Sequence, residues 1–226
     1  MIAARGRLQH TIPIALCAPG AVLALALSCS KTEGPPQSAA ATAPAAPAVS
    51  RSAGTQVTGR APAAPAGIPV IVLLRPKTAQ DVPPQTDKPI MDQVALTFGP
   101  PLLFVRTDQP AEFRNSDDTL HNVHVTHEET KEPQFNVAIP TGEHFTYTFH
   151  RDGFYHVGCD IHPAMSAEIF ASSSPYVTMA EADGSFAVDG VPPGDYALTV
   201  FAGEKRIERA VTVTTGTSTD VNLLDQ

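Results

Sequence analysis

Residues 153–165 read Gly-Phe-Tyr-His-Val-Gly-Cys-Asp-Ile-His-Pro-Ala-Met and place three kinds of metal donor in one short segment. Cys159, His162 and Met165 follow the spacing Cys-x2-His-x2-Met. A thiolate, two imidazoles and a weak thioether form trigonal copper sites, whereas zinc prefers four strong ligands in a closed tetrahedron. The segment therefore predicts a copper site at a turn between two strands, with a second histidine supplied from elsewhere in the chain.

That histidine is found in residues 115–123, which read Asn-Ser-Asp-Asp-Thr-Leu-His-Asn-Val. The two segments together resemble the plastocyanin-like cupredoxins, whose first histidine stands in an F-x-N-x-D…H-N-V segment. The matching positions here are Phe113, Asn115, Asp117, His121, Asn122 and Val123. The Cys-x2-His-Pro-x-Met spacing of the other segment is that of amicyanin, and the resemblance covers roughly residues 90–171.

This resemblance implies a set of ligands and a fold. The implied ligands of one type 1 copper ion are His121, Cys159, His162 and Met165. Met165 would occupy the axial position, which tolerates other donors, and Asn122 would brace the two ligand loops by hydrogen bonds. The implied fold is all-β, with a Greek-key cupredoxin β-sandwich at residues 77–172. Asp160 and Ile161 replace the usual Thr/Ser-Pro, and the carboxylate beside the site can alter its reduction potential.

The surrounding sequence also favours β-structure. Short runs rich in Val, Thr, Phe and Tyr alternate with turn residues, and no convincing helical periodicity is present. The strands predicted between the two metal-binding segments and around them are 56–59, 70–74, 102–105, 111–114, 122–126, 144–149, 154–157 and 167–171. Strands of this length and spacing are typical of a β-sandwich or barrel.

The sequence changes in character after Pro175. Residues 183–201 read Asp-Gly-Ser-Phe-Ala-Val-Asp-Gly-Val-Pro-Pro-Gly-Asp-Tyr-Ala-Leu-Thr-Val-Phe and resemble the carboxypeptidase regulatory-like (transthyretin-like) β-sandwich. The resemblance implies a smaller β-sandwich at residues 173–226, whose first strands are missing from this stretch. Residues 56–76 fit those strands, so the copper domain would be inserted into this second domain. A plain tandem order of the two domains remains the alternative.

The N-terminus resembles an export signal. Two arginines precede an apolar run that ends in Ala-Leu-Ser-Cys, so residues 1–29 are expected to be a signal peptide of the lipoprotein type, with a lipid anchor on Cys29. Cleavage with release into the periplasm, or retention as an anchor helix, are the alternatives. Residues 30–55 are rich in Ala and Pro and are expected to form a linker. We therefore expect an exported, periplasmic protein tethered to the membrane.

The cysteines fit this expectation. Cys17 lies within the expected signal peptide and Cys29 at its end, which leaves Cys159 as the only thiol of the folded part. Cysteines in oxidising compartments normally pair, so a single one needs an explanation. A metal-bound thiolate explains it, and a buried, unreactive thiol is the alternative.

Charge and motifs narrow the function. The net charge is −8 with scattered basic residues, which excludes an electrostatic surface for nucleic acid. Because the sequence has neither the repeated His-x-His pairs of multicopper oxidases nor common hydrolase or phosphate-binding motifs, we expect that the chain is not an enzyme. The leading hypothesis is one-electron transfer to and from a redox partner protein in the periplasm. Copper storage or delivery, and a structural or adhesive β-sandwich with incidental copper, are the competing hypotheses.

Overall fold

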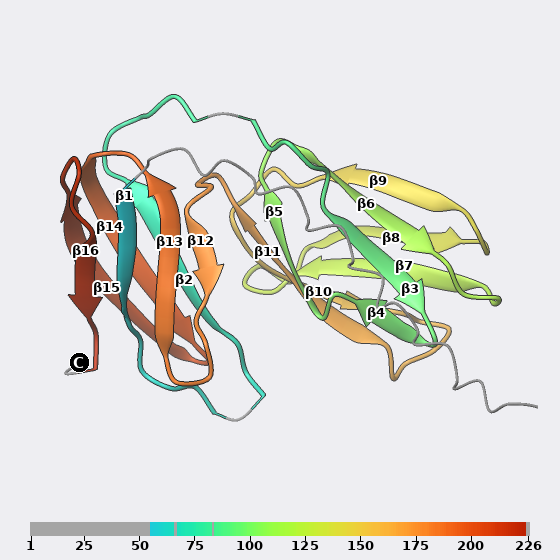
Figure 1. Ribbon diagram of the computed structural model, residues 1–226. Coiled ribbons are helices and arrows are strands. Elements are labelled where there is room, and N and C mark those ends of the chain that lie inside the picture. Colours follow the sequence, from blue (N-terminus) through green and yellow to red (C-terminus); the bar gives the residue numbers. More distant parts are fainter. Residues whose placement is uncertain (1–54, 66, 83, 225–226) are drawn as a thin grey trace, which may run out of the picture. The chain divides into compact units, whose positions relative to one another are not determined.

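The computed structural model describes residues 55–65, 67–82 and 84–224 (Figure 1). These residues form sixteen β-strands arranged in four sheets, which confirms the predicted all-β fold class. Within the described ranges no helix is long and apolar enough to cross a bilayer. The predicted signal peptide, the lipid anchor on Cys29 and nearly all of the predicted linker lie outside the described residues.

The middle of the chain forms a sandwich of two sheets. One sheet has the strand order β5-β11-β10-β7-β8 and the other β4-β3-β6-β9. The strands are β3 (Ile90–Val94), β4 (Thr97–Gly99), β5 (Leu102–Arg106), β6 (Pro110–Asn115), β7 (His121–His127), β8 (Pro133–Ile139), β9 (His144–Thr148), β10 (Gly153–Gly158) and β11 (Ser166–Ser172). Side chains from both sheets form one buried apolar cluster between them.

Alternation along the two central strands decides which side chains enter this cluster. Tyr155 and Val157 of β10 are fully buried, and so are Val123 and Val125 of β7. Because successive residues of a strand face opposite sides, every second residue follows them to the core side of the sheet. His121 lies two residues before Val123 and is fully buried in the same way.

Three strands of this sandwich were not predicted from the sequence. The β3–β4 hairpin is formed by short strands, and β8 begins at a proline, Pro133. Proline lacks the backbone N–H that a central strand needs, but it is tolerated at the edge of a sheet. β8 is the edge strand beside β7, which explains why its sequence does not show the pattern of a central strand.

Residues from both ends of the described chain form a second sandwich. Its strands are β1 (Thr55–Arg60), β2 (Val70–Pro76), β12 (Val177–Met179), β13 (Ser185–Val191), β14 (Gly194–Ala202), β15 (Lys205–Val213) and β16 (Thr219–Asn222). β1 lies between β13 and β16, and β2 lies between β12 and β14. Strand pairing therefore joins residues 55–76 to the C-terminal residues, and β3–β11 lie between these two stretches in the sequence.

Residues 70–74 of β2 are an unbroken apolar run because both faces of this stretch are covered. Val72 and Leu74 belong to the core of the second sandwich. Ile71 and Leu73 face the other way and form a separate buried cluster with Phe170 of β11. A strand that is buried on both faces needs no polar alternation, so the sequence of β2 follows from this double burial.

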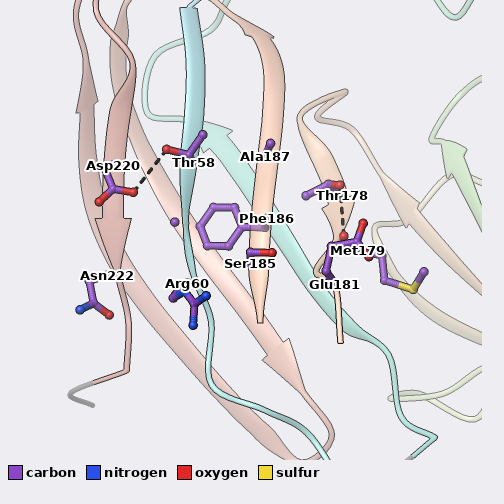
Figure 2. A pocket seen from close by; sticks show the side chains of 11 residues that line it. Thr58, Arg60, Thr178, Met179, Glu181, Ser185, Phe186, Ala187, Asp220 and Asn222 are labelled. Carbon is purple, nitrogen blue, oxygen red and sulfur yellow. Dashed lines mark hydrogen bonds between the residues drawn. The ribbon is translucent and has the colours of Figure 1, made fainter. Parts of the chain in front are cut away.

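A concave surface lies over β1, β13 and β16 of the second sandwich (Figure 2). Its polar side chains are engaged with neighbouring groups: Thr58 donates a hydrogen bond to Asp220 at 3.3 Å, and Arg60 pairs with Asp183 at 3.0 Å. Phe186 packs against the space that Gly59 leaves free, where a Cβ atom would lie 2.6 Å from the ring. These side chains of the surface therefore contact neighbouring residues of the same sandwich.

Glu112 gives the first sandwich a predicted sensitivity to acid. Its side chain is only 7% exposed and pairs with Lys88 and Arg114, which lower the pKa of the carboxyl from 4.5 to about 2. A carboxylate whose pKa is lowered on folding stabilises the fold above its unfolded pKa and loses that contribution as the pH falls through the folded pKa.

We therefore expect Glu112→Gln to destabilise the protein by about 1 kcal/mol at neutral pH, since the partly exposed cations are screened by solvent. The difference from the wild type should shrink as the pH falls from 4.5 towards 2. Urea unfolding over this pH range measures it. A difference that stays constant over the whole range would contradict the assignment.

Candidate metal centre

Three side chains with metal-binding atoms converge at one end of the first sandwich. His121 begins β7, while Cys159 and His162 lie in the loop between β10 and β11. The Cys159 Sγ atom lies 3.9 Å from Nδ1 of each histidine, and the two Nδ1 atoms are 2.9 Å apart. Among the described residues, this is the group of His, Cys and acidic side chains placed closely enough to hold a metal.

Strand alternation explains the convergence. Cys159 follows Tyr155 and Val157 at intervals of two, so it continues the inward-facing side of β10. His121 stands at the same side of β7, which pairs with β10. His162 follows Cys159 by three residues in the same loop. His121 and Cys159 are buried, whereas His162 is only partly buried, so the group lies just beneath the protein surface.

A side-chain contact joins His121 to Asp117. Its Nε2 atom lies 3.0 Å from Oδ2 of Asp117. The backbone N–H of Leu96 and then the His121 ring lower the pKa of Asp117, so this carboxyl is an ionised acceptor at neutral pH. A proton on Nε2 would donate to this carboxylate and would leave the lone pair of Nδ1 directed towards Cys159 and His162. Such outer partners orient the ligands of metal sites.

Asn122 connects the two metal-binding segments. Its Oδ1 atom accepts hydrogen bonds from the backbone N–H of Asp160 at 2.7 Å and of Ile161 at 3.3 Å. The same oxygen lies 3.3 Å from the Sγ atom of Cys159. The side chain that the resemblance implied as a brace thus contacts the loop of Cys159 directly.

Met165 ends the loop and is 2% exposed. Its backbone N–H donates to the carbonyl of His162 at 2.9 Å, which closes the turn between them. The side chain lies in the same buried cluster as Cys159. Its role as the axial ligand stays a prediction.

The donor set and its spacing fit a single ion. Bonds of about 2.0–2.1 Å to nitrogen and about 2.3 Å to sulfur, as found for zinc, allow two ligand atoms on one ion to lie up to about 4.4 Å apart. All three separations here are shorter than that limit. Two imidazoles with one thiolate are the donors preferred by type 1 copper, so the residues present are suited to that ion.

Two partners of the site were not identified from the sequence. Asp117 was noted only as a matching position, yet it fixes the ring of His121. His124 was not connected with the site, yet its Nδ1 atom lies 3.0 Å from Oδ1 of Asp160. Asp117 precedes His121 by four residues, and this spacing was the available clue. No local pattern brings His124 to Asp160, which is 36 residues away.

Asn115 holds the segment that leads to His121. Its side chain is buried, donates to the carbonyls of Thr119 and Ile139 at 2.8 Å each, and accepts from the N–H of Asp117 at 3.0 Å. Asn115→Ala would remove these partners from the buried carbonyl of Ile139 and from the partly buried backbone groups of Thr119 and Asp117. We expect it to destabilise the protein by about 2–3 kcal/mol in urea unfolding.

An exposed asparagine provides the control for Asn115→Ala. The Asn222 side chain accepts a hydrogen bond from the exposed N–H of Leu224. Its replacement by Ala should change the free energy of unfolding by less than about 0.5 kcal/mol. Equal effects of the two substitutions would contradict the structural role given to Asn115.

Comparison with solved structures finds proteins of the copper-binding β-sandwich class. A purple cupredoxin from Nitrosopumilus maritimus is 20% identical, with a TM-score of 0.34, over 38% of this chain and 100% of that chain. Amicyanin from Paracoccus versutus is 16% identical, with a TM-score of 0.35, over 44% and 97%. At these values the likeness assigns no ligand, partner or reaction to the present chain.

The sequence comparisons correct one prediction about the C-terminal part. The matching family profile, polysaccharide lyase family 4 domain II, covers residues 163–221. No curated protein matches. The predicted carboxypeptidase regulatory-like identity is therefore unsupported. The Asp-Gly turns and alternating strands that suggested it are common to many small β-sandwiches, so they identify the architecture but not the family.

A second correction concerns catalysis. We expected that the chain is not an enzyme, but the structures it matches include a copper-containing nitrite reductase from Thermus scotoductus. That match has 24% identity and a TM-score of 0.36, over 44% of this chain and 26% of that chain. This finding contradicts the expectation, which rested only on missing sequence motifs.

Proposed function

We propose that the chain binds one copper ion at a type 1 site and transfers single electrons between partner proteins. The proposed ligands are His121, Cys159, His162 and Met165. The observation that carries the proposal is the convergence of one thiol and two imidazole Nδ1 atoms just beneath the surface. A bound copper ion would supply the chemistry, by accepting one electron from a reducing protein and passing it to an oxidising one.

The protein's own residues would keep the ligand positions fixed while the charge of the site changes. The Asp117 carboxylate holds the ring of His121. The Asn122 amide holds the backbone beside Cys159. A site whose geometry changes little between oxidation states has a small reorganisation cost, which suits electron transfer.

The partly buried edge of His162 is the proposed point of contact with the redox partner. Exposed apolar side chains flank the histidine ligands in the sequence: Leu120 is 47% and Ile161 is 46% exposed. Apolar side chains around a polar centre suit short-lived protein contacts.

We propose that the redox partner is a periplasmic protein and that a lipid on Cys29 tethers the chain to the membrane. Metabolic labelling with a fatty acid, lost in Cys29→Ala, tests the tether.

The electron-transfer proposal is tested with the full chain loaded with Cu(II). We expect an intense visible absorption from thiolate-to-copper charge transfer, at one copper per chain. One electron per chain should bleach it, and an oxidant should restore it over repeated cycles. Absence of the band would contradict the type 1 site. A band whose copper passes to a chelator at each reduction would instead favour the delivery hypothesis.

A further inference from the structure

The Asp160 carboxylate occupies a central position among polar side chains beside the metal-binding group. Its Oδ1 atom lies 3.0 Å from Nδ1 of His124. Its Oδ2 atom accepts from Nδ2 of Asn136 at 2.6 Å and from Nδ2 of Asn122 at 3.1 Å. The Asn122 amide also donates to Oδ1 of Asn136 at 2.7 Å. One carboxylate is therefore contacted by three side chains.

These three side chains come from the sheet, whereas Asp160 belongs to the loop. Asn122 and His124 lie on β7, and Asn136 lies on β8 directly opposite His124. The contacts therefore tie the loop after β10 to two paired strands. Because Asp160 immediately follows Cys159 and lies two residues before His162, a displacement of its backbone would move both proposed ligands.

Asn122 and Asp160 are joined by two hydrogen bonds, one donated by each residue. The Asp160 backbone N–H donates to Oδ1 of Asn122, and the Asn122 amide donates to the Asp160 carboxylate. An isolated surface ion pair contributes little to stability. Here the carboxylate, although its side chain is 57% exposed, fixes the amide that in turn holds two backbone N–H groups of the loop.

We infer that Asp160 is a positioning residue of the proposed copper site, which ties the Cys159–His162 loop to β7 and β8 before the metal binds. This inference rests on the proposed function for its copper readouts. A carboxylate next to the thiolate ligand also favours the more positively charged Cu(II) over Cu(I), so Asp160 lowers the reduction potential. Partial exposure makes this effect weaker at high salt.

Two substitutions separate geometry from charge. Asp160→Ala removes the acceptor for both amides together with the negative charge. Asp160→Asn removes the charge but keeps an oxygen that can accept from Asn122 and Asn136. The matched control is Asp108→Asn, because Asp108 makes a similar carboxylate–imidazole contact, with His150 at 2.8 Å, that involves none of the proposed ligands.

The first readout needs no copper. Hydrogen exchange of the backbone N–H groups of Asp160 and Ile161 in the copper-free full chain reports how firmly Asn122 holds the loop. We expect Asp160→Ala to exchange at both positions about tenfold faster than the wild type. Asp160→Asn should lie near the wild type, and Asp108→Asn should not differ from it. Wild-type exchange rates in Asp160→Ala would overturn the inference.

The second readout uses the copper-loaded chain. We expect Asp160→Ala to lose copper to a chelator about 10–100-fold faster, the range found when outer partners of metal ligands are removed. Both Asp160 variants should have a higher reduction potential than the wild type. If the wild type binds no copper but the exchange result holds, the proposed function fails while the positioning role stands. Unchanged copper loss in Asp160→Ala overturns that role at the site.

Discussion

Replacing Cys159 by alanine is expected to abolish the visible copper band and to lower copper affinity by more than about 100-fold, beyond the loss typical of outer partners. The thiolate is the soft donor that distinguishes a type 1 site from a pair of histidines. The other two side chains of the group, His121 and His162, offer only nitrogen donors, so they do not replace the sulfur. Absorption spectra and competition with a chelator measure the two effects.

Met165→Leu is the matched control, since it changes a buried side chain of the same loop. An axial thioether is a weak ligand, so this variant should keep an intense band, with altered energy and potential. The fold itself should survive Cys159→Ala, because removing one sulfur from a buried position is a small truncation. A visible band that persists in Cys159→Ala would contradict the site.

Phe113→Ala is expected to destabilise the first sandwich by about 3–5 kcal/mol. The ring is fully buried on β6 and packs against Phe135 of β8, with centroids 5.2 Å apart. Truncation leaves a cavity between the two sheets and removes an aromatic contact. Because Asn115 follows on the same strand, copper affinity should fall as well. Urea unfolding followed by circular dichroism measures the stability change.

The comparison for this prediction is Val94→Ala at the end of β3, where the valine is 47% exposed. An exposed position of this kind should change the free energy of unfolding by less than about 0.5 kcal/mol. A loss below about 1 kcal/mol for Phe113→Ala would show that this part of the core is not packed as described.

Neither proposal depends on the second sandwich. Its strands β1 and β2 precede the first sandwich in sequence and pair with strands that follow it. The sheets of this sandwich form only when β1 and β2 pair with strands from the C-terminal part of the chain. Such non-local pairing slows folding, so the C-terminal strands would complete their sheets only after β3–β11 have been synthesised.

The fold class and a set of candidate metal donors were predicted from the sequence alone, and the structure confirms the fold class. Cys159, His162 and Met165 are close because they are neighbours in one loop, and their chemistry can be read from spacing alone. Alternation within a strand is a local property with a period of two residues, and it agrees with the inward-facing positions of His121 and Cys159. That β7 pairs with β10, so that the two side chains meet, is shown by the structure.

Only the tertiary structure decided which groups support those ligands. The contact of Asp160 with His124 joins residues 36 positions apart, and its contact with Asn136 joins residues 24 apart. The first contact depends on the pairing of β7 with β10. The second depends on the position of β8 beside β7, and β8 is an edge strand that begins at Pro133 and was not predicted. Register and loop position result from the packing of the whole sandwich. The sequence therefore pointed to the candidate donors, and the folded structure shows the partners that contact them.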